Sequence, residues 1–499
     1  MLTRVLLTLV KAGVIRPLGP RGLATTASGY LHWNITLAWG YRTGAGRHPH
    51  RAAIIDDDGV LTYAQVDERT SRLAHAFRPK ERIGLLCRNH RGFIETLTAC
   101  TKIGADAVLL NTGLSAGQLA QVAREQQIDR FVADREFAGV LPDRPVVFTD
   151  ELESLIRTGP DRPLPRRPRR GRLIILTSGT TGTPKGAQRP EPASLAPAAA
   201  LLSRIPLKHG DVISIPAPLF HAWGLAAFQL GLVLGATLVL RRRFDPEQTL
   251  RDAERCTAMF VVPVMLQRML EIPLRPKLRI IASSGSSLPP KVAARTLAEF
   301  GPVLYNLYGS TEVSWASIAT PEEMLADPGT AGKPPLGTRL AIVDDHGKPV
   351  APGETGRIFV GNEMLFDGYT NGTSKESLDG LMSTGDLGYL RNGLLFVAGR
   401  DDEMIVSGGE NVYPREVEDL LSQLDGVTEV AVLGVEDDRF GQRLAAYVVG
   451  DDTLTADHVR DHVKAHLARF SVPRDVFFVD ELPRNAAGKV LKRQLREQG

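Results

Sequence analysis

Short apolar runs alternate with longer amphipathic segments between residues 51 and 150. Arg82–Cys87 and Ala107–Leu110 have the length and composition of buried strands, and Gly92–Ile103 between them predicts a helix that ends at Gly104. This strand–helix–strand rhythm is typical of a doubly wound α/β region. The alternation continues further along the chain, and it predicts strands at Leu173–Leu176, Asp211–Ile215, Ala236–Leu240, Met259–Val262 and Leu278–Ala282.

The pattern changes twice in the last third of the chain. From about Ala341 short strands and Gly-rich turns predict a β-rich subdomain. From Asp402 a compact block mixes helices with strands, and Pro414 marks a helix start. Its predicted elements are helices at 414–424, 456–468 and 490–496 and strands at 429–435, 444–449 and 476–479. The sequence therefore predicts a large α/β domain over 51–401, with doubly wound sheets, and a small α+β domain over 402–499.

The first 50 residues form a basic segment, because no Asp or Glu occurs before Asp56. Leu2–Ile15 reads as an amphipathic helix with Arg4, Thr8 and Lys11 on one face. Its apolar run is too short to span a bilayer, and the internal lysine is untypical of a secretory signal. Three interpretations stay open: a helix packed on its own domain, a helix lying on lipid, and an organelle transit peptide.

Composition narrows the class of protein. The chain has 499 residues, of which 43% are apolar and 23% charged, as in ordinary globular proteins. A net charge of +3 is too small to make nucleic acid the main partner. The three cysteines are scattered, which argues against structural zinc and favours a reducing, cytoplasmic compartment, with peripheral membrane attachment as an option.

A phosphate-binding loop is predicted after the apolar run Leu173–Leu176. Glycines allow close backbone approach, hydroxyls and N–H groups donate to phosphate oxygens, and a lysine supplies charge. The spacing differs from that of a Walker loop, since Pro184 precedes Lys185 and Gly186 follows it. The candidate nucleotide-binding residues are Thr177, Ser178, Gly179, Thr180, Thr181, Gly182 and Lys185.

Five further motifs follow in order, and each alone also fits an ordinary turn, cap or surface role. Tyr308-Gly-Ser-Thr-Glu312 combines an aromatic ring, hydroxyls and a carboxylate, which suit a base, phosphate and Mg²⁺. Asp386 is an acceptor suited to ribose hydroxyls. The others are Arg400 with Asp402, then Ser407, Gly408 and Gly409 before Glu410-Asn-Val-Tyr-Pro414, and finally Lys489 on a Gly loop.

Taken together, the motifs resemble those of the adenylate-forming superfamily of acyl-CoA synthetases, carrier-loading adenylation domains and beetle luciferases. The resemblance covers about residues 50–495. The Gly-Gly-Glu-Asn-Val-Tyr-Pro string is similar to the fatty-acyl and aryl-CoA ligase branch. The resemblance to the superfamily implies ATP, Mg²⁺ and CoA as cofactors and a small-molecule carboxylic acid as substrate. It also implies a mobile C-terminal domain that rotates between two half-reactions.

The resemblance also implies roles for individual residues. The loop residues Thr177–Gly182 and Lys185 would hold the β- and γ-phosphates. Tyr308 would face adenine, Thr311 the α-phosphate and Glu312 the Mg²⁺, with Gly309 beside the acyl pocket. Asp386 and Arg400 would hold ribose, Asp402 would be the hinge, and Lys489 would bridge the substrate carboxylate and the α-phosphate. Ser407, Gly408 and Gly409 would form the pantetheine side of the second-step site.

Two further positions bear on the substrate pocket. His221 and Trp223 lie where the family places residues at the mouth of that pocket, although a lone histidine is also a common packing or capping residue. Ser283–Leu288 departs from the family pattern, and Gly285 within it is expected to let adenine approach.

The leading hypothesis is an ATP-dependent acid–CoA ligase for a medium- or long-chain fatty acid. The alternatives are an aryl-CoA ligase, a stand-alone adenylation enzyme that loads a carrier protein, and, outside enzymes, a membrane-associated adaptor that uses the basic N-terminal arm.

Overall fold

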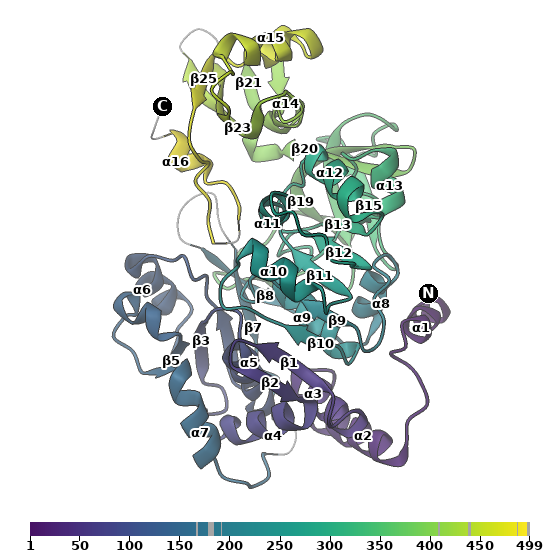
Figure 1. Cartoon of the computed structure of the whole chain (residues 1–499), viewed down its shortest axis with the longest axis vertical. Coiled ribbons are helices and arrows are strands. Elements are labelled where there is room, and N and C mark those ends of the chain that lie inside the picture. Colours follow the sequence, from purple (N-terminus) through teal and green to yellow (C-terminus); the bar gives the residue numbers. More distant parts are fainter. Residues whose placement is uncertain are drawn as a thin grey trace.

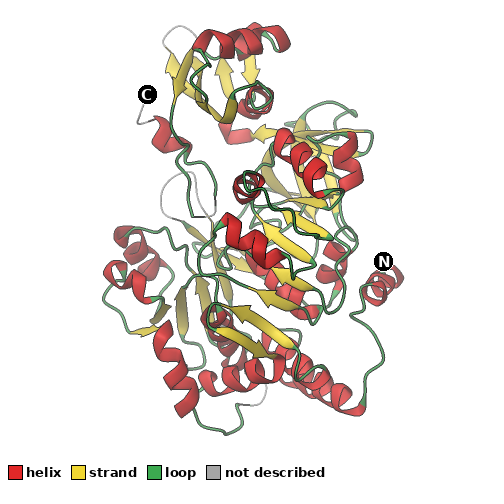
Figure 2. Ribbon diagram, viewed as in Figure 1, coloured by secondary structure: helices red, strands yellow, loops and turns green. Residues whose placement is uncertain are grey.

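The computed structural model describes the chain except residues 166–167, 178–183, 191, 408–409, 438–440, 487 and 497–499. Two large sheets, with helices packed on them, form the body of the molecule, and the terminal block sits at one end (Figures 1 and 2). The mixed α/β architecture, with a large N-terminal part and a small C-terminal part, confirms the predicted fold class.

The first large sheet has eight strands, parallel except at its two edges. Its order is β14 (Ser317–Ala319), β13 (Leu304–Tyr308), β12 (Ile280–Ser283), β11 (Ala258–Val261), β9 (Val212–Ser214), β10 (Thr237–Val239), β1 (Ala52–Asp56) and β2 (Gly59–Thr62).

The second large sheet has seven strands, of which β4, β3, β5, β6 and β7 run parallel. Its order is β17 (Gly368–Tyr369), β8 (Lys185–Arg189), β7 (Leu173–Thr177), β4 (Asp106–Leu109), β3 (Arg82–Leu86), β5 (Arg130–Ala133) and β6 (Val146–Phe148). Strands β7 and β8 form an antiparallel pair in which Thr177 lies opposite Lys185. Lys185 therefore begins a strand on the far side of the predicted phosphate loop.

Local signals start the helices that cover these sheets. Thr62 and Gln65 form a capping box for α4, and a proline opens each of α10 to α13. The helices are α2 (Pro20–Trp33), α3 (Leu37–Arg47), α4 (Tyr63–Ala74), α5 (Arg91–Ile103), α6 (Ala116–Glu125), α7 (Leu152–Thr158), α8 (Ala196–Leu202), α9 (Ala222–Val233), α10 (Pro246–Ala253), α11 (Pro263–Leu270), α12 (Pro290–Phe300) and α13 (Pro321–Ala326).

Helix α9 is apolar all round, as expected of a helix buried inside a large protein. It belongs to a core cluster that also contains Ile213 of the eight-stranded sheet and Ile175 of the seven-stranded sheet. The two sheets therefore share one core, and α9 lies within it.

A third, antiparallel sheet follows and matches the predicted β-rich subdomain. It consists of β15 (Arg339–Val343), β16 (Gly356–Gly361), β18 (Ser377–Leu378), β19 (Leu381–Arg391) and β20 (Leu394–Arg400), and a 3-10 turn, η3 (Asp401–Glu403), leads out of it. The domain boundary at 401/402 stays a prediction.

The terminal block has its own sheet and its own core. Its strands are β21 (Ile405–Ser407), β22 (Glu410–Val412), β23 (Val427–Asp437), β24 (Gly441–Gly450) and β25 (Asp475–Phe478), and its helices are α14 (Pro414–Leu421), α15 (Ala456–His466) and α16 (Lys492–Arg496). Helix α16 begins two residues later than predicted because Val490 forms a β-bridge with Arg484.

The basic N-terminal segment forms α1 (Leu2–Lys11), which packs against α8 with Leu9 and Ala12 buried. The backbone N–H of His209 donates to the carbonyl of Ala12 at 2.8 Å. One face of the helix is thus packed on its own domain, while Leu2, Leu6, Leu7 and Val10 remain exposed on the other. None of the helices in the described part of the chain is long and apolar enough to cross a bilayer, and contact with a membrane surface stays a prediction.

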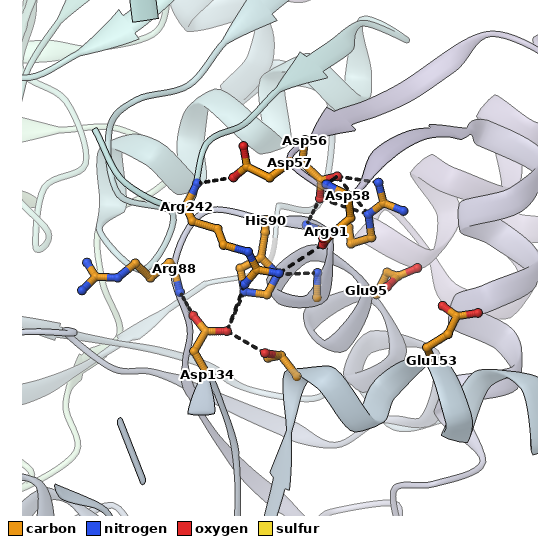
Figure 3. A network of polar contacts seen from close by, with 12 residues as sticks. Asp56, Asp57, Asp58, Arg88, His90, Arg91, Glu95, Asp134, Glu153 and Arg242 are labelled. Carbon is orange, nitrogen blue, oxygen red and sulfur yellow. Dashed lines mark hydrogen bonds and ion pairs between the residues drawn. The ribbon is translucent and has the colours of Figure 1, made fainter. Parts of the chain in front are cut away.

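A polar network fixes the start of α5 against β5 (Figure 3). His90 accepts a hydrogen bond from the Gly92 N–H at Nδ1 and donates from Nε2 to Asp134 Oδ1 at 2.8 Å. Asp134 also accepts hydrogen bonds from the Arg88 N–H and the Thr149 hydroxyl. Both nitrogens of His90 are engaged, so the His–Asp pair has a structural role.

Asp134 should contribute stability only while it is charged. Burial opposes its ionisation, but the hydrogen bonds from His90, the Arg88 N–H and the Thr149 hydroxyl outweigh burial and lower the pKa of Asp134 to about 2. Because this pKa lies below that of an unfolded chain, the stabilisation is present above about pH 4 and is lost as the pH falls towards 2.

We therefore expect Asp134→Asn to lower the free energy of unfolding by about 2 kcal/mol at pH 7, and by less as the pH falls below 4. Urea unfolding of the variant and the wild type across this range measures the difference. The exposed Asp143 provides a matched Asp→Asn control. A difference that does not change with pH would contradict the assignment.

Candidate active site

A cavity of about 1430 Å³ lies where the three sheets of the large part meet the terminal block. It brings together most of the residues that the sequence singled out. From the part of the chain that the structure describes, those that line it are Thr177, Lys185, His221, Trp223, Gly285, Tyr308, Gly309, Thr311, Glu312, Asp386, Arg400, Asp402 and Lys489.

Tyr308 and Asp386 form one hydrogen-bonded unit across two sheets. Tyr308 ends β13, Asp386 lies in β19, and the tyrosine hydroxyl donates to Asp386 Oδ2 at 2.5 Å. Burial raises the pKa of Asp386, and it also raises that of Tyr308, helped by the adjacent carboxylate. Asp386 is half-buried and lines the cavity, and a carboxylate in such a position is an acceptor for hydroxyl groups of a ligand.

Glu312 is buried in the wall of the cavity, directly after the turn that Gly309 makes possible. A Cβ at Gly309 would lie 2.4 Å from the Ser314 carbonyl oxygen, so only glycine fits there. The Tyr369 hydroxyl donates to Glu312 Oε1 at 2.6 Å and orients the carboxylate.

Arg189 provides a partly buried positive charge beside Glu312. Its Nη1 donates to the Thr311 carbonyl at 2.9 Å. Burial lowers the pKa of Arg189 to about 10, and the attraction of Glu312 partly offsets that effect. The guanidinium therefore holds the Thr311–Glu312 backbone in place and partly balances the carboxylate charge.

Lys185 lies on the same wall, with its ammonium 5.5 Å from the centre of the Tyr369 ring. Thr177, opposite it in the β7–β8 pair, donates from its hydroxyl to the Lys185 carbonyl at 3.2 Å. The exposed ammonium remains available to an anion in the cavity.

Lys489 enters the cavity from the terminal block. Its loop is a tight turn in which the Lys489 N–H donates to Asn485 Oδ1 at 3.0 Å. Burial, and then the positive charge of Arg400, lower the pKa of Lys489, although the carboxylates of Glu403 and Asp386 act against this. Lys489, Arg400 and Asp386 are thus close enough to feel one another electrostatically.

Arg400 and Asp402 are paired at the junction of the two parts. Arg400 Nε donates to Asp402 Oδ1 at 2.7 Å, and this hydrogen bond raises the pKa of the arginine. Lys492 of α16 makes ion pairs with Glu403 of η3 and with Glu418 of α14, both at 3.0 Å. These contacts tie the junction to the terminal block.

His221 occupies the N-cap position of α9, where its side chain makes no capping hydrogen bond, and it is half-buried. Burial, and then the charge of Lys489, lower its pKa to about 4, so the ring is neutral near pH 7. The Trp223 indole donates to the Val261 carbonyl at 3.0 Å, which fixes one side of the cavity. Gly285 has φ +97°, a conformation that favours glycine, in the loop after β12.

Several predicted site residues lie outside the described part of the chain. They are Ser178, Gly179, Thr180, Thr181 and Gly182 of the phosphate loop, and Gly408 and Gly409 of the glycine pair. The backbone of Ser407 lies in β21, opposite Glu410.

Sequence reasoning missed Arg189 and Tyr369. Lys185 and Arg189 are four residues apart in one strand and so share a face, which is a weak signal in the sequence. Tyr369 sits in the two-residue strand β17, and its position beside Glu312 follows only from the pairing of β17 with β8.

Comparison with known proteins gives one consistent result. Residues 41–370 match the family model described as AMP-binding enzyme, and residues 416–489 match that of the AMP-binding enzyme C-terminal domain. The chain is 35% identical to an indoleacetate–CoA ligase of Aromatoleum aromaticum, over 91% of this chain and 96% of that protein.

Solved structures agree. The o-succinylbenzoate CoA synthetase of Bacillus subtilis with its acyl-adenylate intermediate superposes with a TM-score of 0.82 at 30% identity, covering 92% of this chain and 97% of that one. The same enzyme with ATP and magnesium ion gives a TM-score of 0.82 at 30% identity, covering 92% and 99%.

The electrostatic coupling between Glu312 and Arg189 can be measured by a double-mutant cycle. Glu312→Gln leaves the partly buried guanidinium without its main counter-charge, and we expect it to lower the free energy of unfolding by about 3 kcal/mol. Adding Arg189→Met removes that charge, so the double variant should be more stable than Glu312→Gln alone. The exposed Glu322→Gln is the control, expected within about 0.5 kcal/mol of wild type. Additive effects of the two substitutions would exclude the coupling.

Proposed function

The chain belongs to the AMP-binding enzyme family and is an ATP-dependent acid–CoA ligase that acts through an acyl-AMP, and from this premise we propose that its acid is an extended apolar one, a medium- or long-chain fatty acid. One observation carries this proposal: the cavity that contains Lys489 and Asp386 is also lined by apolar residues of α9 and of the segments around it, here called the apolar branch. The branch reaches α3 and α5, and its lining includes Ile35, Trp39, Leu97, Leu201, Phe220, Leu225, Ala226, Leu230 and Val233.

The size and lining of this branch suit a flexible hydrocarbon chain. Sites for drug-sized ligands are typically about 300–1000 Å³, and about 1430 Å³ leaves room for both a nucleotide and a long acid. Burial of methylene groups would supply about 0.8 kcal/mol each, so chain length would translate directly into affinity.

An aryl acid is the second candidate, and the comparisons favour it. The indoleacetate and o-succinylbenzoate ligases act on acids that carry aromatic rings. Trp223, packed 5.0 Å from Phe260, provides an aromatic wall near the mouth of the branch, against which such a ring would stack.

The nucleotide would lie across the polar end of the cavity. Asp386 would accept hydrogen bonds from the ribose hydroxyls, with Arg400 beside it, and the Tyr308 ring and Gly285 would face adenine. Thr177 and Lys185 would hold the β- and γ-phosphates together with Ser178, Gly179, Thr180, Thr181 and Gly182. Thr311 would contact the α-phosphate.

Glu312 suits a Mg²⁺ site that the nucleotide completes. Mg²⁺ in proteins commonly takes one or two carboxylates and fills its shell with phosphate oxygens and water. In the described part of the chain no group of three or more Asp, Glu, His or Cys residues could hold a metal by itself, so a single carboxylate oriented by Tyr369 fits this mode. When bound, Mg²⁺ would neutralise charge on the phosphates.

In the first step, an oxygen of the substrate carboxylate attacks the α-phosphorus of ATP, the bond to the β-phosphate breaks, and pyrophosphate leaves. The carboxylate is already ionised at pH 7, so no general base is needed, and neutral His221 would only shape the pocket. The Lys489 ammonium would bridge the carboxylate and the α-phosphate and offset the charge that builds up there.

In the second step, the thiol of CoA attacks the acyl carbon and AMP leaves. The described arrangement, with Lys489 in the cavity lining, would suit the first step. Rotation about Asp402 would withdraw the Lys489 loop and bring Ser407, Gly408 and Gly409 to the pantetheine arm. The contact between Arg400 and Asp402 would have to rearrange during that rotation.

Lys489→Ala should separate the two half-reactions. We expect acyl-adenylate formation to fall by at least about 100-fold, because one charge-stabilising group is lost from the transition state. Thioester formation from pre-made acyl-AMP should stay within about threefold of wild type. Pyrophosphate exchange and single-turnover thioester assays measure the two steps, with the exposed Lys464→Ala as control. Equal loss in both steps would contradict the role of Lys489.

The acid itself is identified by an AMP-release screen, with and without CoA, of acids from acetate to C18 and of simple aryl acids. Ala226→Phe narrows the apolar branch, so we expect kcat/KM for long chains to fall by at least about tenfold, while butyrate changes little. The matched control is Ala27→Phe, at an exposed position of α2. Faster turnover of aryl acids than of any fatty acid would favour the second candidate, and AMP release from neither class would overturn both.

A further inference from the structure

A cluster of cationic and imidazole groups lies in the N-terminal part of the molecule, away from the active-site cavity. It comprises Arg16 from the α1–α2 connection, Arg47 and His48 at the end of α3, Arg51 just before β1, and His209 before β9. None of these residues lines the active-site cavity.

The two histidines serve as acceptors inside this cluster. Arg16 Nη2 lies 2.7 Å from His48 Nε2, and Arg51 Nη1 lies 2.9 Å from His209 Nε2. An arginine can only donate, so each Nε2 accepts and each ring carries its proton on Nδ1. The two rings pack with their centres 4.9 Å apart.

The cluster has no counter-charge of its own. Across the described residues, no salt bridge to a carboxylate is formed by Arg16, Arg47 or Arg51, and no Asp or Glu occurs in the first 55 residues. Arg47 Nη2 reaches only the Val14 carbonyl at 3.3 Å, and its Nε is buried without a partner. Burial and the neighbouring arginines lower the pKa of His48 and of His209 to about 4. Clustered arginines without acidic partners repel one another unless an anion joins them.

A cavity of about 410 Å³ opens beside the cluster and is large enough for a phosphate group. Arg16, Arg47, His48, Arg21 and the backbone of 17–22 line it. The start of the 14-residue helix α2 faces this space, with Gly19 as an N-cap that offers no side-chain acceptor and with no acidic residue in the first turn. Pro20 has no N–H and the Leu23 N–H donates to the Gly19 carbonyl, so the N–H groups of Arg21 and Gly22 are the ones that add donors to those of the arginines.

We propose that this cavity binds the phosphate group of a phosphate-bearing anion, held by Arg16 and Arg47 and by the first turn of α2. Planar guanidinium groups match phosphate oxygens in paired hydrogen bonds, and the site offers donors and no negative charge. Two kinds of molecule carry such a phosphate group: a phospholipid, in its head group, and a soluble phosphate. The exposed Leu2, Leu6, Leu7 and Val10 of α1 give the lipid source a physical basis, since apolar side chains next to basic ones suit an anionic membrane surface.

The test uses the full chain with ¹³C-labelled histidine. Inorganic phosphate is titrated while the Cε1–H resonances of His48 and His209, assigned by His→Gln substitution, are followed. These resonances report on the cluster itself, so binding of phosphate in the active-site cavity does not interfere. Because a bound anion favours the imidazolium, the pKa of both rings should rise from about 4. The charged groups that act on both rings are Arg16, Arg47 and Arg51, and His48 also acts on His209.

The second probe is co-sedimentation with phosphatidylcholine vesicles, prepared with and without phosphatidylglycerol. Whichever of the two probes binds, inorganic phosphate or phosphatidylglycerol vesicles, the double variant Arg16→Gln/Arg47→Gln should weaken its binding about tenfold. This is the effect expected for the loss of charged hydrogen bonds. The matched control, Arg124→Gln/Arg144→Gln, removes the same charge from exposed positions elsewhere. Arg16→Gln alone, at an exposed residue, keeps the test valid if the double variant unfolds.

The outcomes are distinct. If inorganic phosphate shifts the resonances of His48 and His209, and the cluster variants abolish these shifts, the result supports a soluble source. Sedimentation that requires phosphatidylglycerol, and that the cluster variants but not the control lose, supports a lipid source. If neither probe distinguishes the cluster variants from the control pair, the proposal is wrong. Acid–CoA ligase activity enters none of these measurements, so the proposal stands or falls independently of the proposed function.

Discussion

The burial of two carboxylates where three sheets meet is the constraint on which the active site depends. Glu312 is buried and Asp386 is half-buried, so each loses water on folding, and a charge in such surroundings is tolerated only with partners. The partners come from different sheets: Tyr308 from the eight-stranded sheet serves Asp386 of the third, and Tyr369 from the seven-stranded sheet serves Glu312. The sheets must therefore pack together correctly before either carboxylate has its hydrogen-bond partner. The same packing forms the polar end of the cavity.

The same docking places an apolar branch next to the charged end. Helix α9 can be apolar all round because it packs in the core that both large sheets share. The side chains of α9 that do not contact the sheets line the apolar branch. A cavity that is polar at one end and apolar at the other matches an acid whose carboxylate reacts and whose body does not. Remote burial of that body would then position the reacting group.

Charge is distributed unevenly over the molecule. In the active-site cavity the cations Arg189, Lys185, Arg400 and Lys489 face carboxylates or the space for a nucleotide. In the N-terminal cluster Arg16, Arg47 and Arg51 face only histidines and carbonyls. Carboxylates of the protein balance part of the charge in the first arrangement, whereas no carboxylate of the protein pairs with the arginines of the second.

The sequence alone determined the local elements and predicted many of the candidate site residues, although not Arg189 or Tyr369. Strand and helix periods reflect contacts within a few residues, so β3, α5, β4 and the terminal block were predicted to within a few residues of their ends. The motifs gave Lys185, Glu312, Asp386, Arg400 and Lys489. Only the tertiary structure decided which side chains meet, because Tyr308 and Asp386 are 78 positions apart and Arg189 and Thr311 are 122 apart. Such pairings depend on how whole sheets pack, and no period in the sequence records them.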